Sequence, residues 1–251
     1  PAVPLLIKEL NASGGIMVSA SHNQPQDNGI KVFSSHGNKI SSKEKIAIEE
    51  ILSNQIFECE RFGKSYIRND LLEKYEQSLI ASIGSQNLQK IRVVLDLCHG
   101  SATPFGGKIF QSLGAEVIVI NGEADGEKIN VGCGSTNLQP LIQAVLENKA
   151  HMGFAFDGDA DRVIAVDEKG RILNGDHILY LWGSYLKEKK ELEGNRLVAT
   201  IMSNLGFEES WVSKGGILER TLVGDQFVHA KMIASKASLG GEQSGHILSK
   251  I

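Results

Sequence analysis

The sequence predicts an α/β protein with more than one domain. Beyond residue 90, apolar runs of strand length alternate with amphipathic stretches of helix length, which is the β-α-β rhythm of that class. The 27 glycines gather at the ends of apolar runs, where sharp turns need them. A chain of 251 residues, at roughly 100–200 residues per domain, holds two domains or one whole domain with pieces of others.

The first part of the chain reads as two strands followed by two helices. Strands are predicted at 16–18 and 30–33, and they flank a polar segment at 19–29, here named the serine loop. A helix at 41–53 begins with a capping box of Ser41 and Glu44. Its apolar side consists of Ile46, Ile48, Ile51 and Leu52. The polar stretch 55–70 is the candidate linker, and a short helix at 71–80 follows it.

The rest of the chain alternates regularly. Strands are predicted at 91–97, 116–120, 152–156, 163–166, 197–200, 218–222 and near Leu239. Helices are predicted at 105–113, 138–148, 176–189, 207–214 and 226–234. A second domain boundary is expected near 169–174, after which the alternation starts again.

Composition excludes several classes of function. Lys and Arg total 26 and Asp and Glu total 30, a net charge of −4, which argues against a nucleic-acid binder. No apolar run approaches the ~18 residues of a membrane span, and no signal segment opens the chain. Three scattered cysteines exclude a disulfide framework and a zinc finger, and they fit a cytoplasmic protein. The chain opens on Pro1 without an initiator Met, so we expect a fragment or a processed product.

Three carboxylates alternate in the run Asp157-Gly158-Asp159-Ala160-Asp161-Arg162, here named the aspartate loop. Oxygen ligands this dense suit a hard divalent cation, and Mg²⁺ with a phosphate oxygen fits a short loop best. One alternative is a solvated acidic turn. Another is a calcium loop of EF-hand type, but Arg162 stands where that loop needs glycine, and the flanks read as strands.

The serine loop carries Ser19-Ala20-Ser21-His22-Asn23 and then Asp27-Asn28-Gly29. A Ser-His hydrolase is one interpretation, yet Ser21 and His22 are sequence neighbours and no nucleophile elbow surrounds them. A plain polar turn is the other interpretation.

A third segment, Gly240-Gly241-Glu242-Gln243-Ser244-Gly245-His246, is here named the glycine-rich loop. Its carboxylate, amide, hydroxyl and imidazole could hydrogen-bond sugar hydroxyls, although a glycine-rich turn is an equal interpretation. Residues 132–136 are expected to cap a helix rather than to cradle a phosphate. His99, at the end of a strand, is expected to be structural rather than a ligand.

Together, these three loops resemble the α-D-phosphohexomutase superfamily. Its members carry the patterns [ST]-[AG]-S-H-N-P, D-G-D-[AG]-D-R and G-E-x-S-G-H in the order found here. The resemblance covers essentially the whole chain and implies mixed sheets sandwiched by helices. Within the superfamily, Gln243 and the run Val223-Gly224-Asp225 look most like the bacterial phosphoglucosamine mutase subgroup.

The resemblance implies a role for each matching residue. Ser21 would carry a phosphoryl group, and Mg²⁺ would be held by an oxygen of phosphorylated Ser21 together with Asp157, Asp159 and Asp161. The other catalytic residues would be His22, Lys31, Arg162 and His246. The substrate-binding residues would be Gly224, Asp225, Glu242 and Ser244. His246 would act as general acid and base on a sugar hydroxyl.

The implied reaction interconverts glucosamine 6-phosphate and glucosamine 1-phosphate through a 1,6-bisphosphate, with hexosamine or glucose 1,6-bisphosphate as activator. A phosphomannomutase or phosphoglucomutase of the same mechanism, and a non-catalytic metal or sugar-phosphate binding fragment, are the alternatives. We expect sugar phosphates as partners, and neither nucleic acid nor membrane.

The chain also departs from the family pattern. Gln24 replaces the usual proline, which is expected to loosen the serine loop, and Gln226 replaces an arginine. The expected domains are 1–68 (part of domain 1), 69–172 (domain 2) and 173–251 (incomplete domain 3). Domain 4 is expected to be missing, so the piece alone is expected to turn over poorly.

Overall fold

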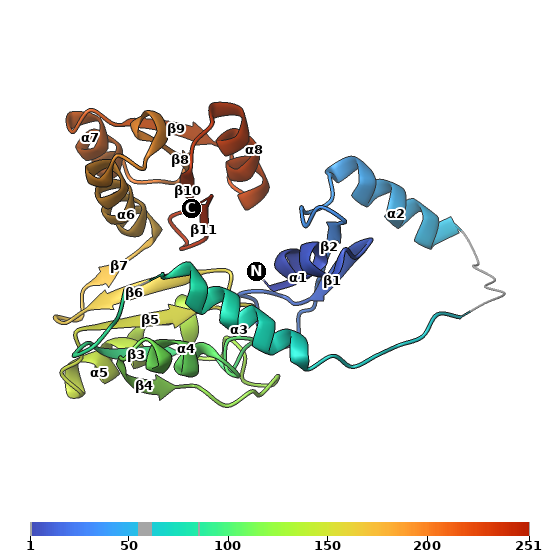
Figure 1. The fold of residues 1–251 in the computed structure, drawn as a ribbon, viewed down its shortest axis with the longest axis horizontal. Coiled ribbons are helices and arrows are strands. Elements are labelled where there is room, and N and C mark those ends of the chain that lie inside the picture. Colours follow the sequence, from blue (N-terminus) through green and yellow to red (C-terminus); the bar gives the residue numbers. More distant parts are fainter. Residues whose placement is uncertain (1, 55–61, 85, 251) are drawn as a thin grey trace. The chain divides into compact units, whose positions relative to one another are not determined.

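The computed structural model describes residues 2–54, 62–84 and 86–250. The chain divides into two compact units, one of residues 1–19 and 28–85, the other of residues 20–27 and 86–251. The candidate linker at 55–70 lies partly outside the described residues, and residues 62–69 form neither helix nor strand. Figure 1 labels the elements of both units.

The first unit is a small α/β assembly around an antiparallel strand pair. Strand β1 (Gly14–Val18) pairs with β2 (Ile30–Ser34), with Gly14 opposite Ser34. Helix α1 (Ala2–Leu10) packs its Val3 and Ile7 side chains against Gly15, where a larger residue would collide with them. Helix α3 (Asp70–Ser82) joins this unit through a Lys74–Glu9 ion pair of 2.9 Å.

Helix α2 (Ser42–Asn54) begins at the predicted capping box. The Ser41 N–H donates to Glu44 Oε2 at 2.8 Å, and the Glu44 N–H donates to Ser41 Oγ at 3.3 Å. The expected apolar side of this helix is not buried by the described residues: Ile46 is 54 % and Leu52 69 % exposed.

The second unit contains two sheets. The first sheet has the strand order β4-β3-β5-β6-β7. Strand β3 (Arg92–Asp96) runs parallel to its two neighbours, β4 (Glu116–Ile120) and β5 (Met152–Phe156). Strands β6 (Val163–Asp167) and β7 (Ile172–Leu173) extend it antiparallel.

Alternate residues of β3 bury against opposite faces of this sheet, as strand geometry requires. Val94 packs with Leu141 and Val145 of α5 (Gln139–Glu147). Val93 and Leu95 belong to the opposite cluster, which Phe110 of α4 (Gly106–Ser112) joins. The sheet is therefore covered by helices on both faces.

The other sheet has the order β11-β10-β8-β9. Strand β8 (Arg196–Thr200) is parallel to β9 (Ile217–Thr221) and β10 (Leu239–Gly241), and β11 (Ile247–Ser249) pairs antiparallel with β10. Leu197 packs under α6 (Gly175–Lys189) and α7 (Leu205–Ser213), whereas Val198 packs on α8 (Asp225–Ser235). The expected α/β fold with mixed sheets between helices is confirmed.

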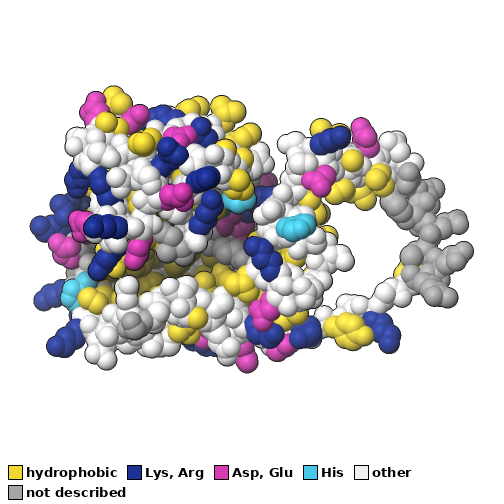
Figure 2. Space-filling view, turned by 45° about the horizontal axis from the view of Figure 1, so that its top comes forward, with side chains coloured by type: hydrophobic (Ala, Val, Ile, Leu, Met, Phe, Trp, Pro, Cys, Tyr) yellow, Lys and Arg dark blue, Asp and Glu magenta, His cyan; other side chains and the backbone are white. Residues whose placement is uncertain are grey.

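The face of the molecule drawn in Figure 2 carries charged side chains of both signs. Figure 2 shows Lys and Arg interspersed with Asp and Glu on that face, as the small net charge suggests. None of the helices in the described ranges combines the length and apolar composition that a membrane-crossing helix needs.

Candidate active site

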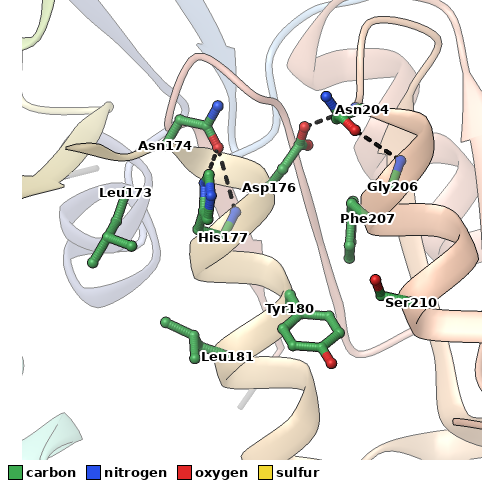
Figure 3. A pocket seen from close by; sticks show the side chains of 10 residues that line it. All are labelled: Leu173, Asn174, Asp176, His177, Tyr180, Leu181, Asn204, Gly206, Phe207 and Ser210. Carbon is green, nitrogen blue, oxygen red and sulfur yellow. Dashed lines mark hydrogen bonds between the residues drawn. The ribbon is translucent and has the colours of Figure 1, made fainter. Parts of the chain in front are cut away.

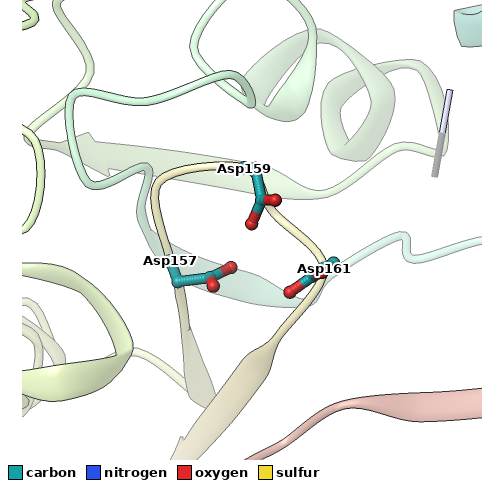
Figure 4. A group of neighbouring side chains, drawn as sticks. All are labelled: Asp157, Asp159 and Asp161. Atoms are coloured by element: carbon teal, nitrogen blue, oxygen red, sulfur yellow. The ribbon is translucent and has the colours of Figure 1, made fainter. Parts of the chain in front are cut away.

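The three carboxylates of the aspartate loop converge. Each of Asp157, Asp159 and Asp161 offers an oxygen within 4.8 Å of the others' oxygens. Figure 4 shows the three side chains turned toward one another. The loop connects β5 to β6, so the hairpin places the three side chains around one point. Asp157 is fully buried and Asp159 is 5 % exposed. Three converging carboxylate oxygens fit a hard divalent cation such as Mg²⁺.

The electrostatics of this group favour a bound cation. Burial, followed by the neighbouring charges of Asp161 and Asp159, raises the pKa of Asp157 to about 6. Hydrogen bonds from the Ser21 hydroxyl and the Arg162 backbone N–H oppose that rise in pKa. The three carboxylates repel one another in this buried site. A divalent cation bound among them would offset that repulsion.

Ser21 is brought to this triad although 136 positions separate it from Asp157. Its Oγ donates a hydrogen bond of 2.9 Å to Asp157 Oδ2. The backbone of Ser21 is left-handed, with φ of 56°, a conformation that costs a non-glycine residue energy. The Ser21 hydroxyl is therefore held directly against one carboxylate of the triad.

Gly158 makes this approach possible. A Cβ there would lie 2.6 Å from the Ser21 carbonyl oxygen and 3.1 Å from the Asn130 amide. On its other side, the Gly158 carbonyl accepts a 2.9 Å hydrogen bond from the Ser101 N–H, and a Cβ at Gly100 would collide with that carbonyl. Three loops thus meet at a point that tolerates no side chain.

Arg162 and His246 flank the triad. The Arg162 N–H donates to Asp157 Oδ1 at 3.1 Å, and its Nε is buried without an acceptor among the described residues. His246 Nδ1 lies 3.6 Å from Asp161 Oδ1, and its Nε2 lies 3.8 Å from Asp225 Oδ2. The imidazole therefore links the aspartate loop to the start of α8.

The glycine-rich loop presents a buried carboxylate and an exposed hydroxyl. Glu242 Oε1 accepts a 2.8 Å hydrogen bond from the N–H of Gly224, the residue that precedes α8. Ser244 is exposed. Gly245, at φ of 93°, bonds through its carbonyl to the Val163 N–H at 3.0 Å, so this loop is anchored at the end of the aspartate loop.

Two predicted site residues, His22 and Lys31, belong to the serine loop and to the strand that follows it. His22 is exposed in the serine loop. Lys31 lies on β2 in the first unit, opposite Met17 of β1.

Sequence reasoning missed two buried residues behind the triad. Asp96, at the end of β3, accepts hydrogen bonds from the N–H of Cys98 at 3.0 Å and of Gly134 at 2.8 Å. Burial raises the pKa of Asp96, which these bonds oppose. Asn130 donates to the Ser21 and Asn23 carbonyls. A lone Asp or Asn in a loop has no local signature; the only signal was the position of Asp96 at a strand end.

The turn after β3 is strained and holds a buried thiol. Cys98 and His99 both have left-handed backbones, with φ of 55° and 52°. The hydrogen bond with Cys133 and burial raise the pKa of the Cys98 thiol, which donates to Asn130 Oδ1 at 3.1 Å. The His99 ring contacts the Glu123 carbonyl at 2.9 Å, which agrees with the structural role expected for it.

The weaker sequence interpretations fare differently. Strands rather than helices flank the aspartate loop, which excludes the EF-hand alternative. Residues 132–136 were expected to cap a helix, but Gly134–Thr136 forms a short 3₁₀ turn, and the Gly134 N–H donates to Asp96. The N–H of Gln139, the first residue of α5, donates to Asn137 Oδ1 at 3.3 Å, so the side-chain acceptor at this helix start comes from outside the predicted segment. Gln24, which stands in place of the usual proline, donates to the Asn130 carbonyl at 3.3 Å.

A cavity of about 470 Å³ lies between α6 and α7 and shares no residue with the triad. Figure 3 shows Asp176 and Asn204 bridged at its wall, with Tyr180 of α6 and Phe207 of α7 also lining the cavity. The Asp176 carboxylate accepts from the Asn204 N–H at 2.8 Å, which fixes the start of α7.

Family models match most of the chain. They describe the α/β/α domains I, II and III of phosphoglucomutase/phosphomannomutase, and they match residues 1–58, 70–170 and 174–250, respectively. A phosphoglucosamine mutase of Parasynechococcus marenigrum is 58 % identical over 99 % of this chain and 54 % of its own length. The chain thus spans about half the length of the curated relatives it matches.

Solved structures show the same fold. A phosphoglucomutase/phosphomannomutase family protein of Burkholderia thailandensis superposes with a TM-score of 0.82 at 26 % identity, over 99 % of this chain and 56 % of that chain. An N-acetylphosphoglucosamine mutase of Aspergillus fumigatus, solved with GlcNAc-6P and magnesium, has a TM-score of 0.63 at 20 % identity, over 98 % of this chain and 63 % of that chain.

Proposed function

Because the chain belongs to the phosphoglucomutase/phosphomannomutase family, we propose that it carries the reacting loops of a phosphoglucosamine mutase. That enzyme interconverts glucosamine 6-phosphate and glucosamine 1-phosphate. The 58 % identity to a protein of that name supports the substrate. Since the chain spans about half the length of such relatives, we assign turnover to the protein at its natural length.

One observation carries the proposal: Ser21 Oγ lies 2.9 Å from Asp157 Oδ2, at a triad of carboxylates. In the proposed reaction, the bond between Ser21 Oγ and phosphorus breaks as a sugar hydroxyl bonds to that phosphorus. The product is a 1,6-bisphosphate. After this intermediate turns round, its other phosphoryl group returns to Ser21, and one sugar phosphate leaves.

The residues divide the work by position. Asp157, Asp159 and Asp161, with a phosphoserine oxygen of Ser21, would hold Mg²⁺, which when bound neutralises charge on the phosphoryl group in transit. Arg162 and Lys31 contact phosphate oxygens in this proposal, and His22 supports the serine loop.

The glycine-rich loop and the start of α8 bind the sugar in this proposal. Glu242 and Ser244 hydrogen-bond ring hydroxyls, and Gly224 and Asp225 complete that subsite. His246 takes the proton of the attacking sugar hydroxyl and returns it in the second half-reaction. Its location between Asp161 and Asp225 supports this role, because carboxylates near both ring nitrogens can hold the imidazole in one orientation.

The proposal extends to the domain organisation, location, activator and partners of the protein. We propose domain boundaries at 68/69 and 172/173, a cytoplasmic location, and hexosamine or glucose 1,6-bisphosphate as activator. The free buried thiols of Cys98 and Cys133 support a reducing compartment. The partners are sugar phosphates, and the product feeds reactions that consume glucosamine 1-phosphate.

The test uses the protein purified at its natural length, with Mg²⁺ and glucosamine 1,6-bisphosphate labelled in its phosphates. Peptide mass spectrometry locates the label, and Ser21→Ala is the control. The expected result is label on Ser21, absent from the variant, and chased off by glucosamine 6-phosphate.

Two other results would contradict the proposal. Label chased mainly by glucose or mannose 6-phosphate would keep the mechanism and change the substrate to a neutral hexose phosphate. No label on a folded protein that binds Mg²⁺ would leave a non-catalytic binding module.

A further inference from the structure

We infer that Asn130 is a positioning residue that clamps the serine loop onto the aspartate loop. The inference rests on the proposed function, because what it positions is the hydroxyl of Ser21. Asn130 lies in the loop after β4, outside the three recognised motifs, and its side chain is 2 % exposed. Its amide contacts the serine loop through backbone carbonyls, whereas the Ser21 hydroxyl bonds to Asp157.

Both amide hydrogens of Asn130 are used on the serine loop. Nδ2 donates to the Ser21 carbonyl at 2.8 Å and to the Asn23 carbonyl at 2.8 Å. These two carbonyls flank His22, so the amide spans the turn that carries the Ser21 side chain. A side chain with one donor, or none, cannot make both bonds.

Two further contacts fix which way the amide faces. Oδ1 of Asn130 accepts from the Cys98 thiol at 3.1 Å, which leaves Nδ2 as the end that faces the serine loop. In return, Gln24 of the serine loop donates to the Asn130 backbone carbonyl at 3.3 Å. Asn130 itself has a left-handed φ of 59°, which asparagine tolerates better than most residues. The clamp is therefore reciprocal and directional.

The clamp matters because Ser21 is held in a strained backbone conformation, at φ of 56°. Released from Asn130, the loop relaxes toward ordinary φ values, and the 2.9 Å contact between Ser21 Oγ and Asp157 lengthens. Phosphoryl transfer depends on alignment of the reacting atoms, and a displacement of about 1 Å can cost about 100-fold in rate. Asn130 thereby acts on the reaction without touching substrate.

The experiment compares Asn130→Ala with Asn121→Ala in the protein at its natural length. Asn121 is a matched control: its φ is also left-handed, at 50°, and its amide donates to Asp96 Oδ1 at 3.1 Å, but no described hydrogen bond joins it to the serine loop. Four quantities are measured: the single-turnover rate of labelling of Ser21 by glucosamine 1,6-bisphosphate with Mg²⁺, hydrogen exchange of peptides covering residues 20–27 and β3, the Kd for Mg²⁺, and the KM for glucosamine 6-phosphate.

For Asn130→Ala we expect a 10- to 100-fold slower labelling of Ser21, with the Kd for Mg²⁺ and the KM for glucosamine 6-phosphate changed less than about 3-fold. Exchange should accelerate in residues 20–27 and stay unchanged in β3. Asn121→Ala should leave labelling within about 3-fold. Asn130→Asp, which keeps the volume and loses the donors, should reproduce the loss if the alanine variant does not fold.

The inference is overturned if Asn130→Ala or Asn130→Asp labels Ser21 at the unaltered rate, or if Asn121→Ala slows labelling equally. If the unaltered protein shows no label at all, the proposed function fails. Hydrogen exchange alone then decides whether Asn130 clamps the serine loop. Faster exchange confined to residues 20–27 then supports the clamp, and unchanged exchange overturns it.

Discussion

The carboxylate of Glu242 accepts a hydrogen bond of 2.8 Å from the backbone N–H of Gly224, which joins the glycine-rich loop to the start of α8. The contact makes one residue both a structural acceptor and a proposed sugar ligand. The two roles can be separated by glutamine. Its neutral amide oxygen can still accept the hydrogen bond from Gly224, but it lacks the negative charge proposed to act on the sugar.

Glu242→Gln should therefore keep the fold and weaken catalysis, whereas Glu242→Ala should harm both. The alanine variant leaves the Gly224 N–H without its acceptor and should lower the free energy of unfolding by about 1–2 kcal/mol. The glutamine variant should lose less than half of that, while its KM for glucosamine 6-phosphate rises about 10-fold or more. Urea unfolding and steady-state kinetics check both, and equal destabilisation by the two variants would contradict the structural role.

Gly158→Ala should slow transfer to Ser21, because its Cβ would meet the Ser21 carbonyl at 2.6 Å. The serine loop must retreat, and we expect at least a 10-fold slower labelling and a loss of roughly 1–3 kcal/mol in stability. Gly126→Ala is the matched control, since a Cβ there meets nothing within 4 Å. Labelling at the unaltered rate in Gly158→Ala would show that the close approach is dispensable.

Without metal, stability should fall as the pH rises from about 4 to about 6. The pKa of Asp157 is raised from 3.8 to about 6 in the folded chain, so folding favours the protonated form, and the folded state loses that advantage as the carboxyl ionises. The loss should be roughly 1–3 kcal/mol by pH 7.

Asp157→Asn should flatten that pH dependence, and millimolar Mg²⁺ should restore stability at pH 7.5 only in the unaltered chain. Urea titrations in EDTA between pH 4 and pH 8, repeated with Mg²⁺, measure both effects. A slope that survives in Asp157→Asn would assign the pH dependence to other groups.

His246→Gln should lower kcat by about 10²–10⁴-fold with little effect on stability, as expected for loss of a general acid and base. His246 lies within 4 Å of a carboxylate of the aspartate loop and of one at the start of α8, so glutamine keeps a polar contact there and loses the proton transfer. The control is His229→Gln, an exposed position on α8. A similar small change in kcat for both variants would remove His246 from the mechanism.

Most of the fold followed from patterns within short windows. The β-α alternation from β3 to β10 matches the predicted strands and helices to within a few residues, because each element carries its own apolar period. Strands β7 and β11 were not predicted. They are only two and three residues long, too short to show an apolar period, and they form by pairing at a sheet edge. Helix α1 was not predicted, although Val3, Ile7 and Leu10 lie at helical spacing.

The candidate site was predictable only in part. The three carboxylates of the aspartate loop are adjacent in sequence, so their convergence could be expected from the residues. The contact between Ser21 and Asp157 spans 136 positions, and only the resemblance to a family pointed to it. Asn130 and Asp96 act through backbone groups, which no residue pattern records, and they had to be seen in place.

Cys98 joins the backbone strain of the turn after β3 to the orientation of Asn130. Glycine at this position would avoid about 1 kcal/mol of left-handed strain. Because Cys98 is fully buried, the same substitution would also leave a void beside Gly134 and remove the thiol that orients Asn130. Relief of strain in this turn is therefore no route to a heat-resistant enzyme, and redesign has to keep a side chain of similar volume with a donor at position 98.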